Sequence, residues 1–215
     1  MFDLLKKRFG PQHWWPGDTP LEIMVGAILV QNTNWMNVEK AITNLKGAAL
    51  LSLDQLADIS QEELAQRIRP AGYYNIKAKR LKNLFSFLQE QHDLDMDSFV
   101  QQDLRAMREG LLTVKGIGPE TADSICLYAG EKPTFVIDTY TYRILTRHLL
   151  IDENSDYHEM QELFMGGLPE DVQLFNEFHA LIVMTGKEFC KPRPLCDECP
   201  LLLWTEERLH KSEAA

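Results

Sequence analysis

Gly116 and Gly118 flank a single apolar residue ahead of a segment rich in small residues, a pattern typical of two helices joined by a tight hairpin. Glycine lets a backbone approach a phosphate closely. Free N–H groups at the start of the second helix can bind that phosphate, helped by the helix dipole. The pattern therefore predicts a site for a phosphate, such as one of a nucleic-acid backbone, at Lys115, Gly116, Ile117 and Gly118. The alternative is an ordinary helical hairpin whose glycines only end helices.

Asp138 follows the hairpin at the end of the apolar run Phe135-Val136-Ile137. A carboxylate placed beside a sugar can stabilise positive charge that develops on the sugar carbon, or deprotonate an attacking nucleophile. Asp138 could instead be only the N-cap of a helix that begins near Thr139. The two roles are compatible, because capping would hold the carboxylate in place.

The segments that must position these residues are almost entirely helical. Apolar residues recur three and four positions apart in residues 21–30, 38–45, 52–59, 62–68, 76–88 and 104–112. Thr19-Pro20 is a helix start signal, and Pro70 with Gly72 stops a helix. We see neither strand alternation nor an internal repeat, so we expect an all-α fold.

The composition restricts the class of protein. With 215 residues and 45% hydrophobic content, the chain suits one or two globular domains. The net charge of −10 opposes DNA binding at long range, but a local basic stripe of Lys77, Lys79, Arg80 and Lys82 could still hold a duplex. Because no apolar run is long enough for a bilayer and the N-terminus lacks a signal-peptide pattern, we expect a cytoplasmic monomer with reduced thiols and no membrane partner.

Four ordered segments resemble the helix-hairpin-helix–Gly/Pro–Asp DNA glycosylase superfamily, and endonuclease III relatives in particular. They are Gln-Asn-Thr at 31–33, Gly-Tyr-Tyr-Asn-Ile-Lys-Ala at 72–78, the hairpin at 111–129, and Val-Ile-Asp-Thr-Tyr-Thr-Tyr-Arg at 136–143. The resemblance implies a two-lobed fold. A six-helix barrel would span residues 21–136, and residues 1–20 and 137–215 would form a second helical domain, with double-stranded DNA between the lobes.

The same resemblance assigns roles to individual residues. It implies that Asp138 is catalytic and that Gln31 fills the gap left when a damaged nucleotide is extruded, a step that costs a few kcal/mol. Tyr73 would be the wedge against the opposite strand, where the family has leucine.

Glu120 occupies the position at which bifunctional members of the family carry a lysine. That lysine attacks the sugar and forms a Schiff base. A carboxylate cannot form an imine, so we expect a monofunctional enzyme in which water attacks the sugar. The alternative is that another lysine, such as Lys115, takes over.

His13-Trp14-Trp15-Pro16 resembles the Trp-Trp-Pro stretch of the helix-hairpin-helix 3-methyladenine glycosylases, which stacks on the target base. That match continues through residues 29–33, 69–75 and 178–179. It implies that Trp14, Trp15 and Pro16 line the base pocket, where an electron-rich indole would attract a cationic alkylated purine. The alternative is that the tryptophans only pack in a core.

Cys190, Cys196 and Cys199 are spaced C-x5-C-x2-C. Endonuclease III relatives bind a [4Fe–4S] cluster through C-x6-C-x2-C-x5-C. Here the first spacing is one residue shorter, and Thr205 occupies the fourth ligand position. We expect a [4Fe–4S] cluster held by three cysteines and another group such as His210. Zinc and a remnant loop without metal are the alternatives.

These observations predict a base-excision enzyme that hydrolyses an alkylated purine from damaged double-stranded DNA. Two rivals stay open. One is a bifunctional glycosylase and lyase for oxidised pyrimidines. The other is a noncatalytic DNA-structure-binding protein that uses the hairpin alone.

Overall fold

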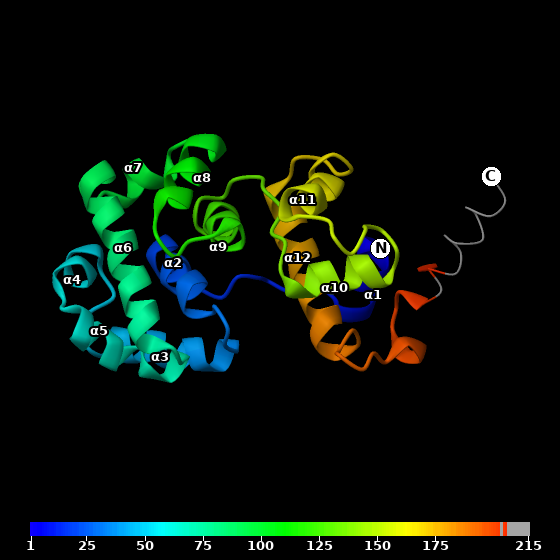
Figure 1. The fold of residues 1–215 in the computed structure, drawn as a ribbon, viewed down its shortest axis with the longest axis horizontal. Coiled ribbons are helices and arrows are strands. Elements are labelled where there is room, and N and C mark those ends of the chain that lie inside the picture. Colours follow the sequence, from blue (N-terminus) through cyan, green and yellow to red (C-terminus); the bar gives the residue numbers. More distant parts are fainter. Residues whose placement is uncertain (203, 206–215) are drawn as a thin grey trace. The chain divides into compact units, whose positions relative to one another are not determined.

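The computed structural model describes residues 1–202, 204 and 205, and every regular element among them is helical (Figure 1), which confirms the all-α prediction. The chain divides into two compact units. The central unit is Pro16–Pro133. The terminal unit joins Met1–Trp15 to the described residues from Thr134 onward.

The central unit contains eight α-helices and two shorter elements within residues 16–133. They are α2 (Pro20–Leu29), α3 (Trp35–Gly47), α4 (Leu53–Asp58), α5 (Gln61–Arg67), the 3-10 turn η1 (Arg69–Ala71), α6 (Tyr74–His92), α7 (Met96–Val100), α8 (Leu104–Thr113), α9 (Pro119–Ser124) and the π-helical turn η2 (Ile125–Ala129).

Side-chain caps begin most of these helices, because a side-chain oxygen at the N-cap satisfies a backbone N–H that has no partner inside the helix. Thr19 accepts from the Glu22 N–H at the start of α2, and Pro20 follows at the first helical position. Equivalent caps are Asn34, Ser52, Ser60, Asp95 and Asp103. These local signals explain why the helix starts could be read from the sequence.

Helix α2 is the centre of this unit. Met24, Val25, Ile28 and Leu29 have no exposed surface, and α2 contacts α3, α6, α9 and η2. A helix that is apolar on all sides must be covered on all sides. The loop that follows α2 is therefore held at a fixed place beside α6 and the hairpin.

The terminal unit is built around α12 (Val172–Glu188), which packs against α1 (Phe2–Phe9) and α10 (Thr139–Arg147) (Figure 1). Helix α11 (Tyr157–Met165) and the 3-10 turn η3 (Cys196–Glu198) complete it. The Phe135 ring stacks on Phe164 at 3.8 Å between centroids and meets Phe175 and Phe178 edge-on. This cluster anchors the segment that leads into Asp138. None of the helices in the described part of the chain has the length and apolar character needed to cross a bilayer.

Candidate active site and DNA interface

Asp138 is the N-cap of α10. Its Oδ1 accepts hydrogen bonds from the Thr141 N–H at 2.7 Å and from the Thr141 hydroxyl at 2.8 Å. Thr141 is fully buried, and the Asp138 side chain is 12% exposed. Asp138 can therefore cap α10 and also serve as a reactive group. Its Oδ1 is used for capping, and its Oδ2 does not take part in the cap.

His179 of α12 lies beside that second oxygen, with its Nε2 3.7 Å from Asp138 Oδ2. Burial lowers the pKa of His179 below its ordinary value, and the Asp138 carboxylate acts in the opposite direction. Burial therefore disfavours a positive charge on the imidazole beside Asp138. Nothing in their spacing along the chain pairs these two residues, because Asp138 caps α10 and His179 lies on α12.

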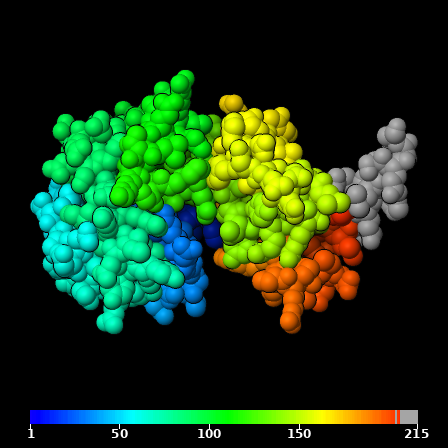
Figure 2. All heavy atoms as spheres, in the orientation of Figure 1, coloured from blue at the N-terminus to red at the C-terminus, as the bar shows by residue number. Residues whose placement is uncertain are grey.

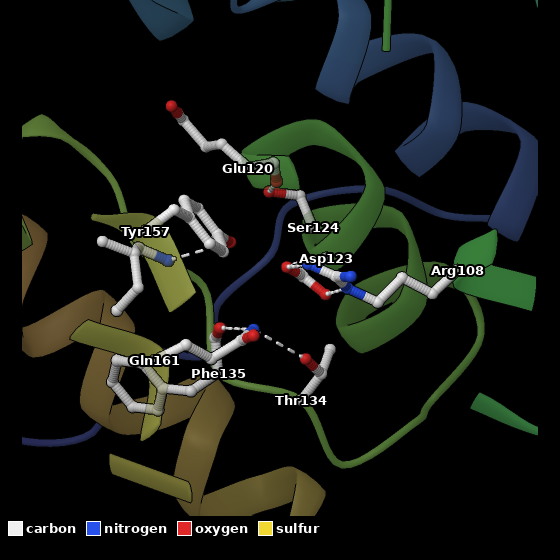
Figure 3. Close-up of polar contacts among 9 residues, drawn as sticks. Arg108, Glu120, Asp123, Ser124, Thr134, Phe135, Tyr157 and Gln161 are labelled. Carbon is white, nitrogen blue, oxygen red and sulfur yellow. Dashed lines mark hydrogen bonds and ion pairs between the residues drawn. The ribbon is translucent and has the colours of Figure 1, made fainter. Parts of the chain in front are cut away.

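Two side chains of α11 hold the backbone that carries Asp138 (Figure 3). Gln161, which is buried, donates from Nε2 to the Phe135 carbonyl at 2.8 Å and to Thr134 Oγ1 at 3.1 Å. The Ile137 N–H donates to the Tyr157 hydroxyl at 3.3 Å. A segment without regular structure must satisfy its backbone groups through such side chains. The only sequence signal for them is a polar residue on the buried face of a helix.

The predicted hairpin lies between α8 and α9. Gly116 has φ +103°, a conformation that side-chain-bearing residues rarely adopt. Ile117 is buried and its N–H bonds the Val114 carbonyl, so this residue faces inward. Lys115 and Gly118 are exposed, and the surface of residues 104–120 is visible in green in Figure 2. The hairpin thus offers backbone at its glycines and charge at Lys115.

An ion pair between a half-buried arginine and a buried aspartate joins the two hairpin helices. Arg108 of α8 donates to Asp123 of α9 through Nε at 2.7 Å and through Nη2 at 3.1 Å. Two parallel bonds of this kind set orientation as well as distance. Figure 3 shows the Glu120 carboxylate extending away from this pair, and Glu120 is exposed in the first turn of α9.

Gln31 lies directly after α2 and contacts the hairpin. Its Nε2 donates to Thr121 Oγ1 at 2.9 Å and to the Gly116 carbonyl at 3.3 Å, and its Oε1 accepts from Arg80 Nη1. Asn32, the next residue, is exposed and has φ +54°. Arg80 was expected only as part of a basic stripe, so its bond to Gln31 is a feature that the sequence did not indicate.

The prediction of a basic stripe is wrong for Lys77 and Lys82. Lys77 is 1% exposed and donates to the carbonyls of Leu29 and Ala71, both at 2.8 Å. Burial, and then the charge of Arg80, lowers the pKa of Lys77 to about 8. Lys82 donates to the Ala57 and Ile59 carbonyls. Both side chains run inward because carbonyls at the ends of α2, η1 and α4 need donors.

Tyr73 precedes α6 with φ +45° and is 69% exposed. A large aromatic side chain held outward by a left-handed backbone is unusual. It is available to a ligand at the surface, as the wedge role requires.

Trp14 and Trp15 are half-buried, and their rings meet edge-on at 5.8 Å. Lys187 Nζ lies over the Trp14 ring, 5.5 Å from its centroid. Pro16 is exposed and is the first residue of the central unit. The tryptophans are thus partly packed, and one face of Trp14 already has a cationic neighbour.

Three thiols lie near the end of the described chain: Cys190 is buried, Cys196 exposed and Cys199 half-buried. Burial raises the pKa of Cys199, and the nearby Cys190 and Cys196 add to the rise. Arg147 Nη1 lies 3.3 Å from Cys190 Sγ and also donates to the Lys191 carbonyl.

The fourth ligand position, Thr205, has its hydroxyl bonded to His148 and to the Leu201 carbonyl. His210 lies outside the described residues. Within the described chain no group of three or more His, Cys, Asp or Glu is arranged to hold a metal ion. Because Thr205 has no thiol, a cluster on Cys190, Cys196 and Cys199 requires a fourth ligand other than the residue at position 205.

Comparison with known proteins points to one family. The model of the HhH-GPD superfamily of base excision DNA repair proteins matches residues 25–170. A Methanocaldococcus jannaschii protein, named provisionally as a DNA repair glycosylase, is 44% identical over 94% of this chain and 92% of its own length. Endonuclease III of Thermotoga maritima is 28% identical over 90% of this chain and 84% of its own length.

Solved structures agree in fold. The Helicobacter pylori 3-methyladenine DNA glycosylase bound to 1,N6-ethenoadenine superimposes with a TM-score of 0.75 at 34% identity, covering 87% of this chain and 97% of that one. An endonuclease III–DNA complex superimposes with a TM-score of 0.80 at 22% identity, covering 97% and 95%. The second likeness is one of fold alone.

Proposed function

The chain belongs to the HhH-GPD superfamily of base excision DNA repair proteins, and on that premise we propose that it is a monofunctional DNA glycosylase that hydrolyses an alkylated purine from DNA. The observation that carries the proposal is the geometry of Asp138. One oxygen of its carboxylate is fixed by Thr141, and the other lies beside the buried His179.

This arrangement suits stabilisation of a cationic sugar. As the bond from the sugar carbon to the base breaks, positive charge develops on the sugar, and a fixed anion lowers the energy of that state. Burial lowers the pKa of His179 and so disfavours a second charge beside Asp138. Water then supplies the oxygen that bonds the sugar carbon, and Asp138 Oδ2 can accept the proton that this water loses.

The absence of a lyase step is proposed from Glu120. Its carboxylate is exposed in the first turn of α9, where bifunctional relatives carry the attacking lysine. A carboxylate has no amine to form the imine on which strand cleavage depends. We therefore expect the product to be a free base and an intact strand with an abasic site.

An alkylated purine is proposed from the tryptophans and from similarity to the 3-methyladenine glycosylase. Alkylation at a ring nitrogen makes the base cationic, which both improves it as a leaving group and attracts an indole face. Trp14 and Trp15 are the candidates to stack on a cationic base, and Lys187 lies over the Trp14 ring.

The proposal is tested with a panel of duplexes that carry alkylated, oxidised or deaminated bases. Release of alkylated purines, with nicks only after alkali, would support it. A second candidate is an endonuclease III-type glycosylase and lyase, favoured by the similarity to the Thermotoga maritima enzyme. Release of oxidised pyrimidines with a covalent adduct trapped by borohydride would establish that candidate instead.

A further inference from the structure

Lys77 of α6 is a buried cation whose two partners belong to different segments. It is 1% exposed, and its ammonium donates to the carbonyls of Leu29, the last residue of α2, and Ala71, the last residue of η1, both at 2.8 Å. With a pKa of about 8, the side chain is mostly protonated at pH 7. Burying a charge is costly, and an apolar residue of similar size would fill the space without that cost. What an apolar residue could not supply is the pair of bonds.

The first of these bonds ends where the loop of residues 30–33 begins, which we call the α2 loop. Within it the Thr33 N–H bonds the Val30 carbonyl at 3.1 Å, and Asn32 is exposed with φ +54°. Gln31 joins the loop to the hairpin through the Gly116 carbonyl. The α2 loop is therefore a surface loop that lies directly beside the proposed phosphate site.

The second bond ends where the two-residue turn of Gly72 and Tyr73 begins, which we call the α6 turn. Both residues have positive φ, +70° and +45°. This backbone is rare for an aromatic residue and persists only where its surroundings fix it. Lys77 contacts the turn on both sides, because its ammonium bonds the Ala71 carbonyl before the turn and its N–H bonds the Tyr73 carbonyl at 3.0 Å.

We propose that Lys77 is a positioning residue that ties the α2 loop to the α6 turn, so that both meet a duplex as one preformed surface. This rests on the proposed function as a DNA glycosylase. A surface that is fixed before binding loses less conformational entropy when it binds. The tie therefore increases the affinity for DNA, although Lys77 itself is buried and does not touch the duplex.

Lys82, on the same helix, supplies a matched control. It is half-buried and donates to the carbonyls of Ala57 and Ile59 at the end of α4, which belong to neither the α2 loop nor the α6 turn. Lys82→Met removes one positive charge and one set of carbonyl contacts, as Lys77→Met does. Any loss of DNA affinity that comes from the charge alone is therefore common to the two variants.

The first measurement is amide hydrogen exchange in the free protein, which reports local opening. The Thr33 N–H, bonded to the Val30 carbonyl, reports on the α2 loop, and the Gly72 N–H, bonded to the Arg69 carbonyl, reports on the α6 turn. In Lys77→Met both should exchange about tenfold faster than in the wild type. In Lys82→Met both should exchange at the wild-type rate.

The second measurement is equilibrium binding to a duplex with a tetrahydrofuran abasic analogue. Lys77→Met should bind it about tenfold more weakly than Lys82→Met does. Melting temperatures establish that the variants are folded under the binding conditions. Lys77→Gln has an amide one atom shorter than the lysine side chain, so it reaches at most one carbonyl. It should show the same loss, and it takes the place of Lys77→Met if that variant is not folded.

Equal binding of the abasic duplex by the Lys77 and Lys82 variants would overturn the proposal. Faster exchange at only one of the two reporters, or throughout the central unit, would also overturn it, because a tie that is lost should release both segments and little else. Neither measurement requires a base to be released. A failure of the proposed function would appear separately, as missing base release by the wild type.

Discussion

Replacing Asp138 by asparagine removes one negative charge and almost nothing else. The Thr141 N–H and hydroxyl both bond Oδ1, and an asparagine side chain offers an oxygen at the same place. Asparagine is as good an N-cap as aspartate, so α10 should form normally and the melting temperature should stay close to that of the wild type.

The expected loss of rate follows from Coulomb's law. A cationic sugar centred about 4 Å from the carboxylate gains about 4 kcal/mol at an effective dielectric constant of about 20. Since about 1.4 kcal/mol corresponds to a tenfold change in rate, Asp138→Asn should slow base release by about a thousandfold. Loss of a fixed electrostatic group in other active sites costs on the order of a hundredfold to a thousandfold.

The assay is single-turnover base release with enzyme in excess over a lesion duplex. Asp171→Asn is the matched control, because Asp171 caps α12 through the Leu174 N–H at 2.7 Å and is exposed. The control should release base at the wild-type rate, and Asp138→Asn should still bind the lesion duplex. A near-wild-type rate in Asp138→Asn would refute the assignment of Asp138 as the catalytic residue.

Three further predictions concern the rest of the molecule. Replacing the tryptophan that stacks on the base, by Trp14→Leu or Trp15→Leu, should lower the preference for a cationic over a neutral base by about tenfold, since a desolvated cation–π contact is worth about 1–2 kcal/mol; a wild-type preference in both variants would remove the argument for stacking. Gly116→Ala should weaken binding to undamaged duplex and lower the melting temperature, because φ is +103° and the new Cβ meets Arg80; normal binding would mean that the hairpin does not contact DNA. Anaerobically purified protein should contain iron and absorb near 400 nm if Cys190, Cys196 and Cys199 hold the expected cluster with another group in place of a thiolate at Thr205; colourless protein without iron or zinc would show that the three-cysteine loop holds no metal.

The helical fold and the hairpin could be predicted from the sequence because their determinants are local. Caps such as Thr19 and Asp138 act within one turn, and apolar spacing identifies the buried faces of the helices. The turn of the hairpin could likewise be predicted from its glycines, since Gly116 has a positive φ, which glycine adopts readily.

The remaining features depend on contacts between distant segments. The sequence neighbours of Lys77 predict a surface cation, yet Lys77 donates to carbonyls at the ends of α2 and η1. The pairing of His179 with Asp138 requires α12 to pack beside α10. Arg80 reaches Gln31 only because α6, α2 and the hairpin meet in one place. Residue type and spacing alone do not predict such contacts between distant segments.

The most direct test of the account is to identify both products formed by the wild-type protein from a duplex with one 3-methyladenine. Mass spectrometry of the soluble fraction and of the strand follows the base and the sugar separately. The account predicts stoichiometric free 3-methyladenine, an intact strand with one abasic site and no borohydride-trapped adduct. With Asp138→Asn, neither the free base nor the abasic site should form in the time that the wild type needs to complete the reaction. Strand cleavage with a trapped lysine adduct, or no base release at all, would contradict it.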